Sequence, residues 1–159
     1  MATQVKAIPE GFHAVTPSLT LKNSLEAIEF YKRAFGATEK FVMTGPDGKM
    51  IMHAELRVGD CVIMLGQEMP GSHCKAVETL HGSPVNFCIY VPNVETEFKR
   101  AIEAGAKEME PLKEQFWGDR MGTVSDPFGF QWSLATRIED LSENEIRERA
   151  KIFFAQKGA

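Results

Sequence analysis

The chain has 159 residues, of which 43% are hydrophobic, and its net charge is −4. This length and composition predict a globular protein of one domain or two very small ones. The negative charge, with scattered lysines and arginines, argues against a nucleic-acid partner. No apolar run approaches the ~18 residues of a membrane span, and the first residues lack a signal peptide's apolar region, so we expect a cytoplasmic protein without a membrane partner.

Three cysteines, Cys61, Cys74 and Cys88, lie far apart in the sequence. An odd number without close spacing is not typical of a zinc site or of a disulfide scaffold. Cys61 and Cys88 also lie inside apolar runs. We therefore expect buried, reduced thiols.

The first elements are a strand and a helix. Residues 15–21 alternate as a β-strand does, and Asn23 with Glu26 forms a capping box for the helix after it. Gly36 is placed to end this helix. Three further strands are expected at about 38–44, 50–57 and 60–66.

Residues 67–83 have no clear period and are the best candidate for a linker. After them the order restarts, with a strand at 85–91 and a helix from Asn93 to Ala104. Strands are expected near 106–110, 119–125 and 130–136. A last helix, about 142–155, begins with a second capping box formed by Ser142 and Glu145.

The restart indicates an internal repeat with an offset of 70 residues. Under this offset a helix cap and two turn glycines coincide, in the pairs Asn23/Asn93, Gly48/Gly118 and Gly59/Gly129. The sequence therefore predicts an α+β fold of two βαβββ modules, one at about 13–66 and the other at about 84–136. We expect them to form a curved eight-stranded mixed sheet with an open concave face, plus the C-terminal helix.

Alternation along each predicted strand separates an apolar side from a side with small polar groups. The polar sides either face water or converge on one surface that lines a pocket. If they converge, the candidate binding residues on them are Thr16, Ser18, Asn86, Cys88, Tyr90, Gln131 and Ser133.

Two further groups are candidates for chemistry. His53 and Glu55 lie two residues apart on a strand, hence on one face, where they could act as a general acid–base pair, share a metal, or make ordinary polar contacts. Arg120, close to Trp117, could clamp a carboxylate or phosphate, or form a local ion pair. We take His53 and Glu55 as candidate catalytic residues, and Trp117 and Arg120 as candidate binding residues.

Four stretches resemble one family. They are SLEAIEFYKRAFGA (24–37), IMHAEL (51–56), WGDRMGTVSDPFGFQWSLAT (117–136) and IEDLSENEI (138–146). Together they resemble the vicinal oxygen chelate superfamily, which is the glyoxalase, bleomycin-resistance and extradiol dioxygenase fold, and within it the PhnB-like branch. The resemblance implies a single domain over most of the chain, and modules that pair in a homodimer.

In metal-dependent members of this superfamily, four positions on the concave face hold the metal. Matched onto this chain they are Thr16, Asn86, Ser133, and either Ile63 or Met64. Two positions where the branch often has histidine are Phe130 and Arg137. None of these residues is a histidine or a carboxylate, so the resemblance implies that the standard metal site is absent.

The resemblance and the residues together lead to two functional hypotheses. The first is a protein that binds a small molecule on the concave face without the standard metal. The alternative is a metal-dependent lyase or dioxygenase-type enzyme that uses His53 and Glu55 with a divalent metal in a non-standard place. A purely structural or interaction domain is a third class, and the identity of any cofactor stays open.

Overall fold

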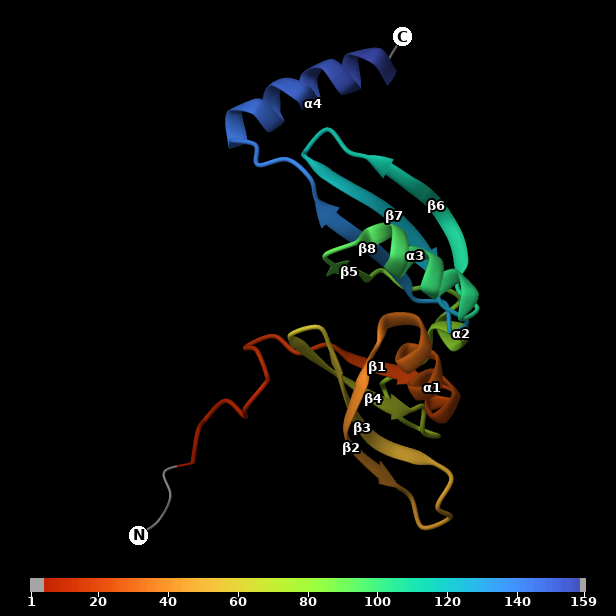
Figure 1. Ribbon diagram of the computed structural model, residues 1–159. Helices are drawn as coiled ribbons and strands as arrows, with labels where there is room; N and C mark the ends of the chain where they lie inside the picture. Colours follow the sequence, from red (N-terminus) through yellow and green to blue (C-terminus); the bar gives the residue numbers. More distant parts are fainter. Residues whose placement is uncertain (1–4, 158–159) are drawn as a thin grey trace. The chain divides into compact units, whose positions relative to one another are not determined.

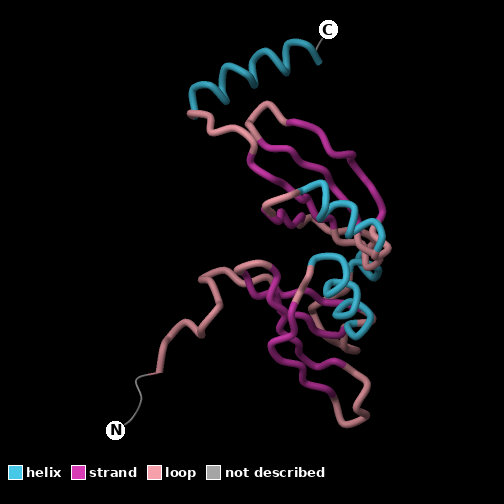
Figure 2. The backbone as a smooth tube through the Cα atoms, viewed as in Figure 1, coloured by secondary structure: helices cyan, strands magenta, loops and turns pink. Residues whose placement is uncertain are grey.

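The computed structural model describes residues 5–157 of the chain. Contacts within the chain divide it into two compact units, residues 1–83 and residues 84–159. In each unit, one strand and one helix are followed by three strands (Figures 1 and 2). The expected βαβββ repeat is therefore confirmed.

The first module consists of β1 (Ser18–Leu21), α1 (Ser24–Phe35), β2 (Thr38–Thr44), β3 (Ile51–Val58) and β4 (Cys61–Gln67). Its strands are ordered β1-β4-β3-β2, with β1 parallel to β4 and the other pairs antiparallel. The Asn23 side chain accepts a hydrogen bond from the Glu26 backbone N–H at 3.2 Å, which caps α1 as predicted. Gly36 ends the helix with φ +62°, in the left-handed region that favours glycine.

Helix α1 covers one face of this sheet (Figure 1). Its buried side chains include Ala27, Ile28 and Tyr31, and the strands bury Leu19 and Leu56 among others. This apolar layer is the core of the first module, because removal of such side chains from water is the main favourable term in folding. We call the sheet face opposite to the helix the open face of each module.

One prediction of alternation is wrong within β3. The sequence pattern places Met52 on the covered face and Ile51 on the open one, but Ile51 is 2% exposed and Met52 is 43% exposed. The register explains the exchange, since Met43 pairs with His53 whereas Thr44 pairs with Ile51, and Met52 is the extra residue of a bulge. A bulge reverses the alternation beyond it.

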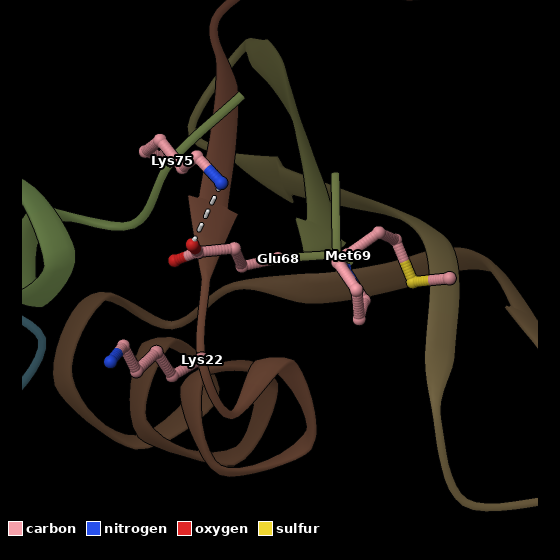
Figure 3. Close-up of a pocket in the computed structure, with 5 residues that line it drawn as sticks. Lys22, Glu68, Met69 and Lys75 are labelled. Carbon is pink, nitrogen blue, oxygen red and sulfur yellow. Dashed lines mark ion pairs between the residues drawn. The ribbon is translucent and has the colours of Figure 1, made fainter. Parts of the chain in front are cut away.

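The segment that we predicted as a linker contains a short helix, α2 (Val77–Leu80). Glu68 organises it, because its Oε2 accepts hydrogen bonds from the Ala76 N–H at 3.0 Å and the Thr79 hydroxyl at 2.6 Å. Its Oε1 lies 3.5 Å from the ammonium group of Lys75 (Figure 3). Glu68 and Lys75 also line a cavity of about 320 Å³, together with Lys22, Met69 and Pro70. Tertiary contacts of one carboxylate thus order a stretch that has no period of its own.

The second module consists of β5 (Asn86–Tyr90), α3 (Val94–Glu103), β6 (Lys107–Glu114), β7 (Asp119–Ser125) and β8 (Gln131–Arg137). Its strand order, β5-β8-β7-β6, repeats that of the first module. The Asp-Pro-x-Gly turn of residues 126–129 joins β7 to β8, and the buried Asp126 carboxylate accepts hydrogen bonds from Phe128 N, Phe130 N and Trp132 Nε1, each at 2.9 Å. The outer strand β6 carries Pro111 and several charged residues.

The C-terminal helix, α4 (Glu143–Lys157), comes after β8 and is confirmed with its capping box. The Glu145 carboxylate accepts hydrogen bonds from the Ser142 N–H and hydroxyl at 2.8 and 2.6 Å. The described strands form two four-stranded sheets, one in each unit, where the sequence predicted one sheet of eight.

The structure also tests the predictions for the cysteines and for a membrane-spanning helix. Cys61, Cys74 and Cys88 are exposed free thiols, so the expectation of burial is wrong. Cys88 lies on the uncovered side of the alternating strand β5, and Cys61 is the exposed first residue of β4. Over residues 5–157, no helix has the length and apolar character to cross a membrane.

Candidate functional site

The open face of the second module gathers five of the predicted binding residues. In the parallel pair of β5 and β8, Asn86 lies beside Gln131, Cys88 beside Ser133, and Tyr90 beside Ala135. The covered face of the same strands carries the apolar side chains Phe87, Ile89, Trp132 and Leu134. The alternation is therefore as predicted on these two strands, whereas the binding roles of Asn86, Cys88, Tyr90, Gln131 and Ser133 stay predictions.

A cavity of about 350 Å³ lies at the end of this face, lined by Tyr90, Trp117, Asp119 and Arg137. The Tyr90 hydroxyl donates to Asp119 Oδ2 at 2.8 Å, and Trp117 Nε1 donates to the same oxygen at 2.9 Å. The Asp119 residue is 5% exposed, whereas Tyr90 is 64% exposed. One buried carboxylate thus holds the polar ends of two aromatic side chains, one of which presents its ring to solvent.

The Asp119 carboxylate changes the acid–base properties of its neighbours. Its hydrogen bond from the Tyr90 hydroxyl, together with partial desolvation of that hydroxyl, raises the pKa of Tyr90 to about 12. Partial desolvation of the Cys88 thiol by its neighbours, with the negative charge of Asp119, also raises its pKa. The phenol therefore stays protonated at neutral pH, and the thiol is a weak nucleophile because a thiolate is the reactive form. These groups are suited to hydrogen bonding more than to covalent chemistry.

Arg137 forms the other side of the cavity. Its Nη2 donates to Asp140 Oδ1 at 2.6 Å, and its Nε donates to the backbone carbonyl of Glu139 at 3.2 Å. Two existing partners thus hold this guanidinium group. Asp119 and Arg137 are paired residues of β7 and β8, and so lie on the same face of the sheet.

Sequence reasoning missed Asp119 as a site residue and selected its neighbour Arg120. The two lie on opposite faces, since Asp119 pairs with Arg137 and Arg120 pairs with Thr136. Arg120 forms ion pairs with Glu95 and with Glu114, which is the local ion pair considered as the alternative to a clamp. Alternation along 119–125 is the signal that could have identified Asp119.

The open face of the first module has a different character. His53 Nε2 lies 3.3 Å from Glu55 Oε1, so the two candidate catalytic residues do contact one another. The ring centroids of Phe41 and His53 are 6.2 Å apart. The register places Ser18, Met64 and Glu55 in one row across the sheet.

The register also places two of the family's metal positions. Met64 lies on the open face beside Ser18, whereas Ile63 is buried opposite Leu56, so Met64 matches the fourth family position. Thr16 lies before the start of β1, and its hydroxyl donates to the carbonyl of His13 at 3.1 Å.

The residues at the four metal positions do not fit a divalent metal. Thr16, Met64, Asn86 and Ser133 provide neutral hydroxyl, thioether and amide groups, and the hydroxyl oxygens of Ser133 and Thr123 lie 3.1 Å apart. Zinc and iron sites use imidazole, thiolate or carboxylate ligands. Over residues 5–157, no three His, Cys, Asp or Glu side chains lie close enough to hold a metal ion.

The fold and these positions can be compared with known proteins. The model of the Glyoxalase/Bleomycin resistance protein/Dioxygenase superfamily matches residues 13–134, and the chain belongs to this superfamily.

An uncharacterised protein of Mycobacterium bovis is 39% identical over 137 residues, covering 84% of this chain and 90% of that protein. The X-ray structure of an Arabidopsis thaliana gene product has a TM-score of 0.64 at 26% identity, covering 78% of this chain and 98% of that one. The fosfomycin resistance protein FosX of Listeria monocytogenes has a TM-score of 0.59 at 12% identity, covering 84% and 97%, and shares the fold alone.

Proposed function

We propose that this protein binds a small organic molecule at the Tyr90–Trp117–Asp119–Arg137 cavity, without the metal that other members of the superfamily use. The observation that carries the proposal is the pair of aromatic side chains held on one buried carboxylate. Cavities that bind small molecules combine apolar walls with a few convergent polar groups. Neutral residues at the four family metal positions support the absence of metal from the function.

The lining residues favour a ligand with a flat ring and a positively charged or hydrogen-bond-donating group. The exposed ring of Tyr90 and the indole of Trp117 provide aromatic surface. Both bonds to Asp119 end on Oδ2, so neither donor uses Oδ1. The charge of Arg137 is already matched by Asp140. A cation near aromatic faces and a carboxylate is therefore favoured over an anion.

The test uses three indoles of equal ring size and different charge: tryptamine, indole-3-ethanol and indole-3-acetate. Each is titrated into the full chain and followed by ¹H–¹⁵N NMR. We expect tryptamine to bind most tightly and to shift the Trp117 indole N–H and the amides of Tyr90 and Asp119. Asp119→Asn should remove the preference for the cation, and Glu148→Gln, an equal charge change on the solvent side of α4, should keep it. If none of the three shifts these resonances at millimolar concentration, the proposal is wrong.

A second candidate function rests on the contact between His53 and Glu55. A histidine beside a carboxylate can act as a general acid–base pair, with or without a metal in a non-standard place. Elemental analysis of protein purified without a histidine tag tests this candidate. Stoichiometric metal that is lost in His53→Ala would favour it, and absence of metal together with unchanged tryptamine binding in this variant would exclude the metal-dependent form.

We also propose that the protein is a homodimer of the PhnB-like branch. Each module leaves large apolar side chains uncovered, including Phe41 and Met43 in the first and Val85 and Met109 in the second. Such surface is typical of protein interfaces. Light scattering coupled to size-exclusion chromatography should give twice the 17.7 kDa mass of the chain. A monomeric mass at micromolar concentration would exclude the homodimer.

A further inference from the structure

Helix α4 contacts the neighbourhood of the cavity through aromatic rings. The ring of Phe153 lies 5.1 Å from that of Phe116, measured between centroids, and Phe116 meets Trp117 edge to face at 4.9 Å. The exposed Phe154 also approaches Phe116, at 6.0 Å. Trp117 is a wall of the cavity. Phe116 therefore contacts both α4 and the Trp117 side of the cavity.

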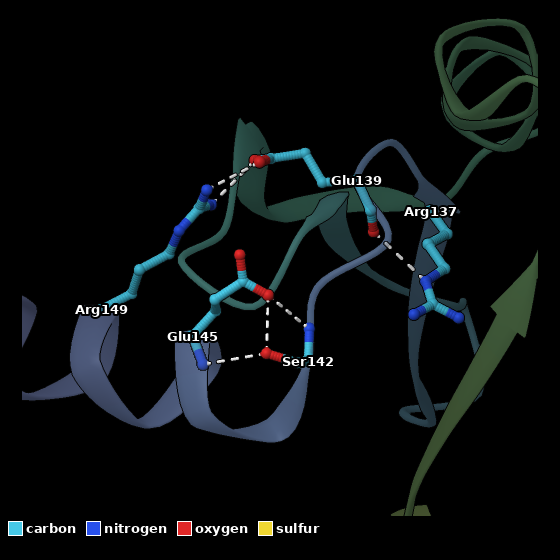
Figure 4. Close-up of polar contacts among 5 residues, drawn as sticks. All are labelled: Arg137, Glu139, Ser142, Glu145 and Arg149. Carbon is cyan, nitrogen blue, oxygen red and sulfur yellow. Dashed lines mark hydrogen bonds and ion pairs between the residues drawn. The ribbon is translucent and has the colours of Figure 1, made fainter.

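A second connection is polar and reaches the opposite side. Arg149 of α4 donates two hydrogen bonds to the Glu139 carboxylate, Nη1 to Oε1 at 2.9 Å and Nη2 to Oε2 at 2.7 Å (Figure 4). The backbone carbonyl of Glu139 accepts from Arg137 Nε at 3.2 Å. A two-bond arginine–carboxylate pair sets orientation as well as distance. Glu139 thus connects α4 to Arg137, which also lines the cavity.

The two connections meet in the backbone at Gly118. Its carbonyl accepts hydrogen bonds from the N–H groups of Ile138 and Glu139, at 2.9 and 3.0 Å. A Cβ at Gly118 would lie 2.9 Å from the Glu139 carbonyl oxygen, and the glycine has φ +94°. The segment that carries Trp117 and Asp119 is therefore packed directly on the segment that precedes α4.

Few contacts of its own hold α4 in place. Along its length most side chains are exposed, Ile152 at 61% among them, whereas Ile146, Arg149, Ala150 and Phe153 are partly covered. A 15-residue helix is marginal in water without tertiary packing. Docking of α4 therefore depends on the same contacts that reach the cavity.

We propose that α4 is a positioning element of the ligand cavity, in which Phe153 and Arg149 set the places of Trp117 and Arg137. The expected consequence is that ligand affinity depends on the docking of α4, and this consequence rests on the proposed function. By thermodynamic reciprocity, a ligand that needs the docked arrangement also stabilises it. A bound ligand should then slow hydrogen exchange of the α4 amides.

The experiment uses tryptophan as a reporter that needs no ligand. The full chain contains two tryptophans, and 5-fluorotryptophan labelling gives two ¹⁹F resonances that Trp117→Phe assigns. We expect Phe153→Ala and Arg149→Met to shift or broaden the Trp117 resonance and to leave that of Trp132 unchanged. Phe153→Tyr, which keeps the ring, should restore the native signal. Tryptamine should bind about two- to tenfold more weakly to the two altered chains.

The matched controls lie on the same helix. Ile152→Ala removes an exposed neighbour of Phe153, and Arg147→Met removes an arginine whose ion pair, with Glu143, lies within α4. Both should keep the native Trp117 resonance. An unchanged Trp117 resonance in Phe153→Ala and Arg149→Met would overturn the inference, whatever tryptamine does. A shifted resonance in a chain that binds no indole would keep the coupling and refute the proposed function instead.

Discussion

The two modules have the same topology and nearly the same covered face, but their open faces differ. Leu19, Leu56 and Leu65 in the first correspond in kind to Ile89, Val124 and Leu134 in the second, all of them on the covered side. The open face of the first carries His53 and Glu55 beside Phe41, whereas that of the second carries Asp119 under two aromatic rings. The covered faces, which form the duplicated core, are similar in the two modules. The open faces carry different polar and aromatic side chains.

The modules also differ in the segment that comes after each of them. After the first lies a stretch that Glu68 orders locally, and after the second lies α4, which contacts the residues around the cavity. The two modules therefore differ in the segment that follows them as well as in their open faces.

Asp126→Ala should be the most damaging change, because it leaves the buried donors of Phe128, Phe130 and Trp132 without this acceptor. Each such donor costs about 1–3 kcal/mol, so we expect a loss of about 3 kcal/mol or more in urea denaturation. The exposed Asp60 occupies the corresponding turn of the first module, and Asp60→Ala should cost less than about 0.5 kcal/mol. Equal losses in the two variants would contradict the contrast between the turns.

Gly118→Ala and Gly48→Ala are equivalent changes under the 70-residue offset. Both glycines have positive φ, +94° and +66°, but a Cβ at Gly48 would meet no described atom within 4 Å, whereas one at Gly118 would lie 2.9 Å from a carbonyl oxygen. We expect about 1 kcal/mol of destabilisation at Gly48 from backbone strain, and at least about 1 kcal/mol more at Gly118. Only Gly118→Ala should also move the Trp117 indole N–H in an NMR spectrum.

Acid should loosen α4 before the rest of the second module. The hydrogen bonds from Arg149 hold the pKa of Glu139 below its usual range, and those from Ser142 do the same for the pKa of Glu145. A carboxylate with a lowered pKa stabilises the folded state above its ordinary pKa, and this contribution is lost as the pH falls through the lowered value. Below about pH 4 we therefore expect the protection factors of the α4 amides, which compare each exchange rate with that of an unfolded chain at the same pH, to fall.

The control for this acid effect is Arg149→Met, which removes the partner of Glu139. In this variant the protection factors of the α4 amides should be low at neutral pH, and they should change less on acidification. Glu68 of the first module also has a lowered pKa, chiefly through its bond from Thr79, so α2 should respond to acid independently of Arg149. A response of α4 that is identical in the two chains would show that the Glu139–Arg149 pair does not hold the helix.

His53→Ala should have only a small effect on stability. The side chains of His53 and Glu55 are 33% and 22% exposed, and such partly exposed pairs contribute less than about 1 kcal/mol. Urea denaturation of the variant should therefore give a midpoint near that of the native chain. A loss of stability well above about 1 kcal/mol would mean that the open face of the first module contributes to the stability of the fold. The difference in role between the covered core and the open face would then be wrong.

Most of the fold could be predicted from the sequence because its signals are local. The caps at Asn23, Asn93 and Ser142 and the turn at Asp126 each involve residues within four positions. The bulge at Met52 and the ordering of α2 by Glu68 could not, since both depend on partners brought by another strand or by a distant turn.

The site was predicted less well for a related reason. Alternation identified Tyr90 and Ser133 on the open face, because β5 and β8 have clear apolar partners. Asp119 was missed because its significance comes from the convergence of Tyr90 and Trp117 on one oxygen, which is a tertiary contact over 29 residues in one case. Arg120 was preferred for its charge, although the register turns it toward Glu95.

The outer strands of the two sheets differ in how they resist unwanted association. β6 carries Pro111 and several charges along its length, features that discourage another strand from adding to a sheet edge. β2 has no proline and exposes Phe41 and Met43. We expect concentrated or partly unfolded protein to aggregate through β2 first. Phe41→Lys or Met43→Lys should then reduce the aggregation of this protein at high concentration.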